Sequence, residues 1–191
     1  NNQRNGGTPS NGNLEYNGPG TRTMIGTTGG PFPTSGKWAI AIKAAQVSTT
    51  MGWSYGLQKA EDADMGDAAG SNEDIGAGTG GANMTPQSSD GYYYNYSTST
   101  ATDPSLPITT SDEFWLAVDI DSGKYWFGIY DASASGYKWV AADAGLDGDP
   151  GAGTNETGSL TGLQNNTGNF EFIFSSKQTN QILYLQREAD L

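Results

Sequence analysis

This chain of 191 residues contains neither cysteine nor histidine. Without cysteine, it cannot form disulfides, thiolate metal sites or a cysteine nucleophile. Without histidine, it cannot form a Ser-His-Asp triad, a histidine-based zinc site or an imidazole general base. The commonest designs of hydrolytic enzymes are therefore excluded for this chain on its own.

Basic residues and long apolar segments are scarce as well. The sequence has 9 Lys and Arg against 21 Asp and Glu, which gives a formal net charge of −12. Such a chain would on average repel the phosphates of a nucleic acid, so we expect no nucleic-acid partner. No run of about 18 apolar residues is present, so we expect no membrane insertion. The negative charge suits an extracellular location or the surface of a particle.

Glycine and aromatic residues, by contrast, are abundant. The sequence contains 28 Gly, 10 Tyr and 5 Trp, a composition typical of short aromatic strands separated by turns. The segments with clear apolar periodicity alternate with a period of two, and none has a helical period. The length suits one domain. We therefore predict an all-β fold, an antiparallel two-sheet β-sandwich.

The clearest element is a β-hairpin over residues 112–130. Apolar residues alternate with others up to the turn Asp121-Ser122-Gly123, and a second aromatic run follows this turn. The alternation places four apolar side chains on one face, namely Phe114, Leu116, Val118 and Ile120. A hairpin cannot cover this face itself, so a second sheet is expected. We predict that the strands carrying Trp38 and Phe172 lie over it.

The rest of the chain divides into further strands, loops and an arm. Strands are predicted at 13–16, 21–28, 38–43, 51–57, 91–96, 137–140, 170–174 and 181–185. Two acidic, glycine-rich stretches at 58–87 and 143–157 predict loops. The polar residues 1–12 predict a flexible arm or linker before a domain over 13–191. Because the chain opens on Asn1 rather than Met, we expect it to be a segment of a longer or processed polypeptide.

Two carboxylates of the hairpin are candidates for catalysis. Asp119 and Asp121 lie two residues apart, so both side chains are expected on the face opposite the apolar stripe. Glycoside hydrolysis needs two carboxylates and neither His nor Cys. Turn carboxylates mostly serve the turn, however, and the E-x-D-x-x-E signature of sandwich-fold glycosidases is absent. We predict no catalytic residue, and keep a carbohydrate-active enzyme using this pair as the alternative.

No cofactor is predicted, although the second acidic loop has residues that could bind calcium. Asp143, Asp147 and Asp149 would supply carboxylate oxygens, which are the ligands that calcium prefers. The loop lacks the 12-residue register and the final Glu of an EF-hand, so the likeness is one of composition. A solvated loop without metal is the simpler interpretation.

An aromatic strand is the candidate contact surface. Alternation places Tyr92, Tyr94 and Tyr96 on one face, where exposed Tyr would offer flat apolar area with a polar tip to a sugar or a protein. The alternative is that this face belongs to the core, which aromatic residues often fill in a sandwich.

Taken in order, the strand motifs resemble those of a SPRY domain. The matching residues are Ser35-Gly36-Lys37-Trp38, Gly52-Trp53, the strand 92–96, Asp119-Ile120-Asp121-Ser122-Gly123 with Phe127, and 170–174. The family typically shows S-G-K-x-Y-x-E near its start and D-x-D-x-G-x-x-x-F later. The sequence departs from this pattern at Ala41, where Glu is usual, and at Tyr130-Asp131, where Asn-Gly is usual.

The resemblance covers residues 13–185 and is closest in kind to SPRY-like segments of bacteriophage and environmental virus structural proteins, which carry the same N-G-N-L…S-G-K-W opening. It implies a twisted sandwich of the concanavalin-like jelly-roll type, used as a binding or decoration module. It implies no catalytic residues, and it places ligand contacts in variable loops at one end of the sandwich.

The predicted function is a non-enzymatic structural or binding module of a virion, such as a capsid decoration, fibre or tail-associated protein of a phage. Its location would be the virion surface. Expected partners are other virion proteins and a host-surface protein or glycan, contacted through loops in an oligomeric or multivalent assembly. A free SPRY-type adaptor that binds a host protein is a further alternative.

Overall fold

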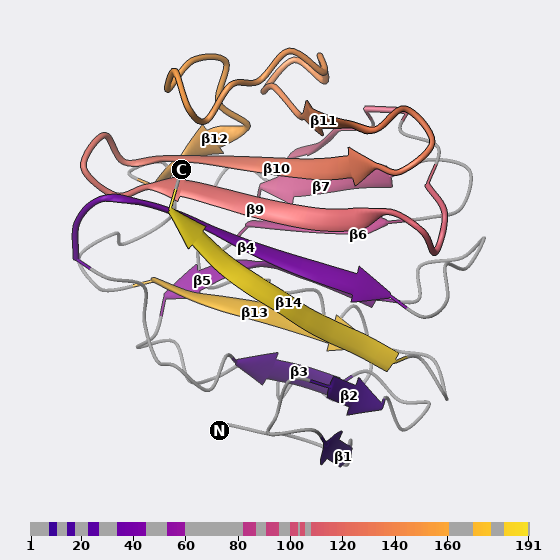
Figure 1. Cartoon of the computed structure of the whole chain (residues 1–191). Helices are drawn as coiled ribbons and strands as arrows, with labels where there is room; N and C mark the ends of the chain where they lie inside the picture. The colour runs from indigo at the N-terminus through magenta and orange to yellow at the C-terminus, as the bar shows by residue number, and fades with distance from the viewer. Residues whose placement is uncertain are drawn as a thin grey trace.

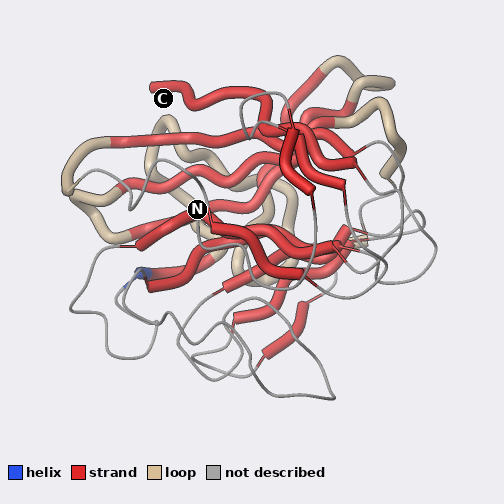
Figure 2. Tube along the Cα trace, turned by 90° about the horizontal axis from the view of Figure 1, so that it is seen from below, coloured by secondary structure: helices blue, strands red, loops and turns tan. Residues whose placement is uncertain are grey.

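Two antiparallel sheets make up the fold in the computed structural model (Figure 1). The structure describes residues 8–10, 15–17, 23–26, 34–44, 53–59, 82–86, 91–95, 100–102, 104–105, 108–160, 170–176 and 182–190. Strands account for most of this part of the chain, and its loops lie at the strand ends (Figure 2). None of the described segments is a helix long and apolar enough to cross a bilayer.

The first sheet has eight strands. Their order is β1 (Thr8–Ser10), β2 (Glu15–Asn17), β14 (Ile182–Asp190), β4 (Lys37–Ala44), β9 (Glu113–Asp119), β10 (Lys124–Asp131) and β11 (Gly136–Trp139), and the short β12 (Gly158–Ser159) also pairs with β10. The chain therefore leaves and re-enters this sheet several times, since its neighbours are mostly not consecutive in sequence.

The second sheet has six strands. Their order is β3 (Thr23–Gly26), β13 (Phe170–Ser176), β5 (Trp53–Lys59), β6 (Ala82–Pro86), β7 (Gly91–Asn95) and β8 (Thr100–Thr102). Every strand pairing in both sheets is antiparallel. The prediction of an all-β, antiparallel two-sheet sandwich is confirmed.

The hairpin predicted at 112–130 is also confirmed, as β9 and β10. Its register runs from Lys124 opposite Asp119 to Tyr130 opposite Glu113. The predicted apolar stripe faces the core: Phe114, Leu116 and Val118 are fully buried, and Ile120 packs against the same cluster. The alternation of the sequence therefore reports the two faces of this sheet correctly.

The strands around this stripe are arranged differently from the prediction in one respect. Phe172 lies on β13 in the second sheet and is buried in the shared core, as expected. Trp38 lies on β4, which pairs edge to edge with β9 instead of lying over it. Alternation identifies the face on which a side chain lies, but it does not say which strands share a sheet.

Four further strands were not predicted, among them the short β12. Residues Ala82–Pro86 form β6 inside the predicted loop 58–87, and Thr100–Thr102 form β8. Thr8–Ser10 of the predicted arm form β1, which pairs with β2. Ala82 and Met84 of β6 are fully buried, but two small or flexible apolar residues beside Asn and Pro give too weak an alternation to predict a strand.

A buried tyrosine connects the two sheets across the core. Tyr55 extends from β5 to the first sheet, where its hydroxyl donates to the carbonyl oxygens of Trp115 and Gly128, each at 3.2 Å. Its ring packs edge-on against Phe127, with ring centroids 5.5 Å apart. Burial raises the pKa of Tyr55 well above its usual value, against the opposite effect of the hydrogen bond with Gly128.

Candidate binding surface

The face of the first sheet that points away from the core carries a second apolar cluster. Ala39, Ala117 and Trp126 are buried in it, and Trp115 and Trp139 pack against them. The register explains the grouping, because Trp126 lies opposite Ala117, and Ala117 lies opposite Ala39. Small residues on β4 and β9 thus leave room for the large indole of β10.

One glycine is required by this packing. A Cβ atom at Gly128 would lie 2.3 Å from the ring of Trp139, far inside van der Waals contact. Gly128 is paired with Trp139 across β10 and β11, so the indole lies flat over the glycine backbone. The missing side chain on β10 therefore fixes the position of the aromatic side chain on β11.

Beside this glycine, four aromatic side chains form what we call the aromatic ledge: Trp115, Tyr130, Tyr137 and Trp139. Tyr137 is at its centre and stacks on Trp139 at a centroid distance of 6.0 Å and an interplanar angle of 11°. Tyr130 and Trp115 meet it edge-on, at 5.0 Å and 5.7 Å. Despite these three contacts Tyr137 is 55% exposed, so its ring is held in place and still open to solvent.

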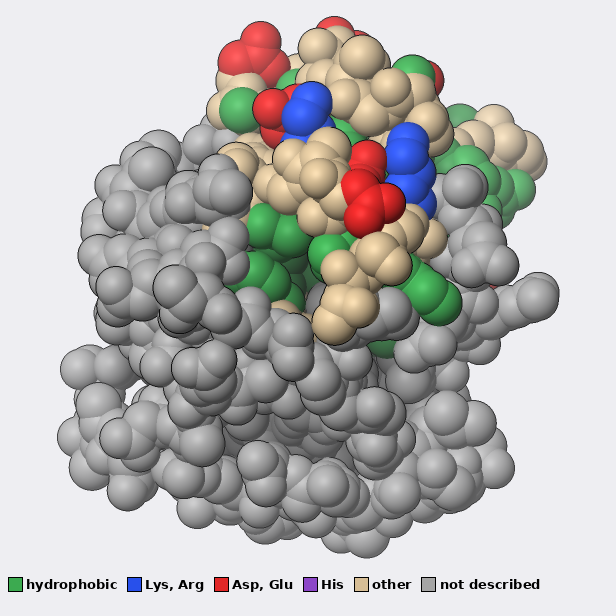
Figure 3. All heavy atoms as spheres, turned by 90° about the vertical axis from the view of Figure 1, so that its left-hand side faces the viewer, with side chains coloured by type: hydrophobic (Ala, Val, Ile, Leu, Met, Phe, Trp, Pro, Cys, Tyr) green, Lys and Arg blue, Asp and Glu red, His purple; other side chains and the backbone are tan. Residues whose placement is uncertain are grey.

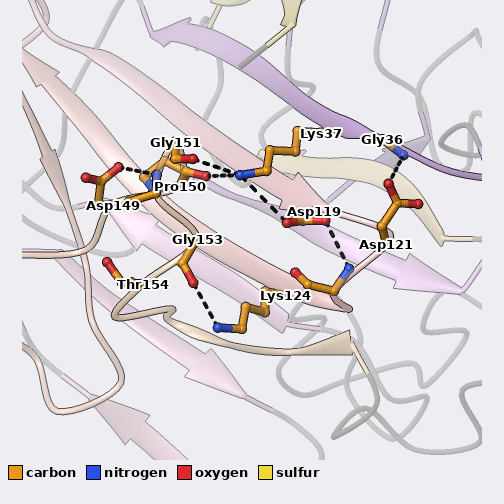
Figure 4. A network of polar contacts seen from close by, with 12 residues as sticks. Gly36, Lys37, Asp119, Asp121, Lys124, Asp149, Pro150, Gly151, Gly153 and Thr154 are labelled. Atoms are coloured by element: carbon orange, nitrogen blue, oxygen red, sulfur yellow. Dashed lines mark hydrogen bonds and ion pairs between the residues drawn. The ribbon is translucent and has the colours of Figure 1, made fainter.

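The chain leaves the ledge at Trp139 and forms a loop over residues 140–157. Three side chains of the sheet hold it through its backbone, and Figure 4 shows the two lysines among them. Lys37 Nζ donates to the carbonyl oxygens of Pro150 and Gly151, at 3.1 and 2.8 Å, and Lys124 Nζ donates to that of Gly153 at 2.9 Å. The indole N–H of Trp126 donates to the carbonyl oxygen of Thr154 at 3.0 Å.

The end of the same loop is built into the sheet by Thr157. Its hydroxyl accepts a hydrogen bond from the backbone N–H of Phe127 and donates to the carbonyl oxygen of Val140. Thr157 is buried, and it fills the place where β10 changes partner from β11 to β12. Both ends of the 140–157 loop are thus fixed, so the side chains between them are held in defined positions.

A shallow pocket of about 390 Å³ opens on this loop. Its lining includes the acidic side chains Asp143, Asp147 and Glu156. Glu156 pairs with Lys124 at 3.1 Å, and its own backbone N–H and this lysine lower the pKa of its carboxyl. Charged side chains of both signs lie close together on the side of the molecule that Figure 3 shows, which is the left-hand side of Figure 1.

The three predicted calcium ligands lie in the loop but are used separately. Asp143 accepts from the N–H of Gly145, Asp147 from the amide of Asn155, and Asp149 from the N–H of Ala152. Across the described ranges, no three acidic side chains are grouped closely enough to hold a metal ion. A solvated loop without metal stays the prediction, with calcium at these residues as its alternative.

Asp119 and Asp121 serve structural contacts. Asp119 accepts from the backbone N–H of Ser122 at 3.0 Å, and Asp121 accepts from that of Gly36 at 3.2 Å (Figure 4). Burial acts to raise the pKa of Asp119, but the hydrogen bonds from Ser122 and the charge of Lys37 outweigh it, so that this pKa is lowered. The sequence analysis predicted that both aspartates stabilise their own turn. Asp121 instead binds the backbone of Gly36, in the segment that leads into β4.

The predicted tyrosine surface lies elsewhere in the fold. Tyr92 and Tyr94 belong to β7 in the second sheet, but their side chains are outside the described part of the structure, as is Tyr96 altogether. Their role stays a prediction. The sequence analysis missed the ledge. The signal that could have revealed it is the alternation of Trp126, Gly128 and Tyr130 on one strand and of Tyr137 and Trp139 on the next.

No protein-family model and no curated protein matches the sequence. Among solved structures, the fold is similar to the TRIM65 PSpry domain, with a TM-score of 0.58 and 11% identity over 95% of this chain and 85% of that one. It is also similar to the SPRY domain of human HERC1, with a TM-score of 0.54 and 12% identity over 96% and 93% of the two chains. A third likeness, to carbohydrate binding module CBM66 from Bacillus subtilis, has a TM-score of 0.45 and 8% identity over 98% and 92%.

The two likenesses above a TM-score of 0.5 agree with the motifs found in the sequence. They extend over nearly the whole chain and include both sheets. At 11 and 12% identity they establish the architecture and leave the ligand open. This chain therefore has the fold of a SPRY domain.

Proposed function

We propose that this chain is a non-enzymatic binding module whose contact surface is the aromatic ledge together with the adjoining 140–157 loop. The observation that carries the proposal is Tyr137, a residue that is 55% exposed although three other rings pack against its ring. A held ring can bury its apolar face against a partner with little further loss of conformational freedom. The fixed loop beside it adds polar groups in defined positions.

The same structure argues against the carboxylate pair as a catalytic site. A glycosidase needs one carboxylic acid whose pKa is raised, so that it can protonate the leaving group. The pKa of Asp119 is lowered instead, and one of its oxygens accepts from the turn. Asp121 is hydrogen-bonded to Gly36. Asp119 is therefore not prepared to donate a proton, and Asp121 has a structural contact instead.

We further propose the surface of a phage virion as the setting in which the module works. This part rests on the opening N-G-N-L…S-G-K-W of the sequence and on the net charge of −12, which suits an extracellular surface. Many copies on one particle would let weak single contacts act together. Mass spectrometry of purified virions should find this chain among the structural proteins, and its absence from particles would remove the virion setting while leaving the binding module.

The binding module is tested by presenting the whole chain to an array of peptides and glycans. We expect at least one ligand class to bind, and Tyr137→Ala to reduce that binding. The exposed Thr110→Ala, which changes a turn before β9, is the control and should bind as the unchanged protein does. If Tyr137→Ala binds every ligand as well as the control does, the ledge is not the contact surface.

The enzymatic alternative has its own test. Polysaccharides are incubated with the unchanged protein and with Asp119→Asn and Asp121→Asn, and new reducing ends are measured. We expect no release of sugar from any of the three proteins. Cleavage by the unchanged chain that is lost in a folded Asp119→Asn variant would overturn the non-enzymatic assignment.

A further inference from the structure

The aromatic ledge is bordered by carboxylates that no cation of the described part neutralises. Trp139 forms a parallel β-bridge with Asp147, and the N–H of Gly148 donates to the carbonyl oxygen of Trp139 at 3.0 Å. Bridged residues lie about 4.8 Å apart and point to the same face. Asp147, which is exposed, therefore lies beside Trp139, at the end of the ledge where the loop begins.

The lysines nearest to this loop are already engaged. Lys37 holds the carbonyl oxygens of Pro150 and Gly151, and Lys124 holds that of Gly153 and the carboxylate of Glu156. The sequence has no other basic residue between Lys138 and Lys177, and Lys138 pairs with Asp131 at 2.7 Å. Asp143 and Asp147, both exposed, make no ion pair with any residue that the structure describes.

The edge of the sheet at Tyr137 is suited to an extended backbone. The N–H of Val140, just after β11, donates to the carbonyl oxygen of Phe127. Hydrogen-bonded positions alternate along an antiparallel pair, so the next one is Lys138, opposite Ile129. The backbone groups of Tyr137 consequently point away from β10, at the end of the strand order of this sheet. An added strand could pair there.

From these three features we infer that the ledge binds an extended, Arg- or Lys-bearing segment of a partner protein. This inference rests on the binding module proposed above and names its ligand. A guanidinium or ammonium group would lie over the exposed face of Tyr137, where the ring attracts cations. A neighbouring basic side chain would reach Asp147 or Asp143, and the backbone would lie along the edge at Tyr137.

The test uses the full chain and two fluorescein-labelled octapeptides, one of alternating Arg and Ser and one of alternating Glu and Ser, with binding followed by fluorescence anisotropy. We expect the Arg peptide to bind about tenfold or more tightly than the Glu peptide. Tyr137→Ala should weaken the Arg peptide by about two- to fivefold, the range of an exposed cation–π contact, while Tyr137→Phe keeps the ring and the affinity.

Charge variants separate a local site from the general attraction of an acidic protein. Asp147→Asn should weaken the Arg peptide by about two- to fivefold, the upper range of an exposed ion pair. Asp121→Asn removes the same charge at the opposite end of β9, where an amide oxygen can still accept from Gly36, and should leave binding unchanged. If both variants have the same effect, or if Tyr137→Ala has none, the inference is wrong.

A neutral glycan in the same assay distinguishes this inference from the broader proposal. Binding of a neutral polysaccharide that Tyr137→Ala abolishes, with no preference for the Arg peptide, would overturn the basic segment and keep the ledge as a binding surface. If Tyr137→Ala changes the binding of neither the peptides nor the polysaccharide, both the inference and the proposed function fail.

Discussion

At the scale of single residues, this protein uses polar side chains to join backbone segments. Tyr55 crosses the core to reach two carbonyl oxygens, Thr157 bridges Phe127 and Val140, and Asp121 reaches the N–H of Gly36. Each of these side chains connects elements that are distant in sequence. Such contacts follow from the assembled fold, so residue type and spacing alone could not predict them.

Removing the Tyr55 hydroxyl should weaken the connection between the sheets. Tyr55→Phe keeps the ring and loses the hydrogen bonds, so we expect the free energy of unfolding to fall by about 1 kcal/mol. Urea denaturation measures the change. Tyr137→Phe removes a hydroxyl from an exposed ring and should cost little, which makes it the matched control. Equal losses in the two variants would contradict a bridging role for Tyr55.

The raised pKa of the same hydroxyl predicts that folding stability decreases at alkaline pH. Because the pKa of Tyr55 is raised in the folded state, its contribution to stability is complete below the ordinary value of 10.0 and decreases as the pH rises above it. Part of the loss of stability above pH 10 should therefore disappear in Tyr55→Phe. A pH series of urea midpoints for both proteins checks this, and parallel curves would contradict it.

The lowered pKa of Asp131 predicts that folding stability decreases in acid. Hydrogen bonds from Lys138, Ser133 and the N–H of Ala134 hold the pKa of Asp131 well below its usual 3.8. The ionised form is thus favoured in the folded state, and its contribution is present above pH 3.8 and lost as the pH falls through the lowered pKa. Thermal unfolding of Asp131→Asn between pH 6 and 2 should be less steeply pH-dependent than that of the unchanged protein. Thr110→Ala should keep the original slope.

At the scale of elements, the sequence predicted strands well where both faces are distinct. The β9–β10 hairpin alternates strongly because one face enters the core, and β4 does the same through Ile40 and Ile42. β6 and β8 are short and have few apolar residues, so their pairing depends on neighbouring strands that no local pattern reveals. The order of strands within a sheet, such as β4 beside β9, was not predicted for the same reason.

Gly128 is a residue of β10 whose missing side chain positions Trp139 in the aromatic ledge. Gly128→Ala would place a Cβ atom 2.3 Å from the ring of Trp139, so the indole must move and the stack on Tyr137 must open. We expect a loss of about 1–3 kcal/mol, typical of overpacking, together with a change in tryptophan fluorescence. Gly136→Ala, where the nearest atom is 3.8 Å away, is the control. If both variants melt alike, the close approach at Gly128 is unimportant.

At the scale of the whole molecule, the fold and the surface were not equally predictable. Alternation and turn residues were enough to predict a two-sheet sandwich, and the order of motifs suggested the SPRY type. The ledge combines residues of β9, β10 and β11, and the sequence analysis placed the contact surface on Tyr92, Tyr94 and Tyr96 instead. The sequence analysis chose the strand with most tyrosines. Tyr137 is identified by its exposure, which depends on how the sheets pack and cannot be deduced from residue types.

Integrity of the molecule should not depend on metal. Asp143, Asp147 and Asp149 each accept a hydrogen bond from their own loop, and two lysines fasten that loop to the sheet. We therefore expect the same melting temperature in EDTA and in millimolar calcium. A bound ion at 100 times its dissociation constant would add about 2.7 kcal/mol, which calorimetry would detect. A higher melting temperature in calcium would establish the calcium site.

The attachment of the 140–157 loop to the sheet through its backbone determines how this surface can change by mutation. Lys37, Lys124 and Trp126 hold carbonyl oxygens, and every amino acid supplies one. The attachment is therefore indifferent to most side chains of the loop. Mutations could exchange its outward residues one after another while its path over the sheet is conserved, so a single scaffold could acquire new ligands without having to refold.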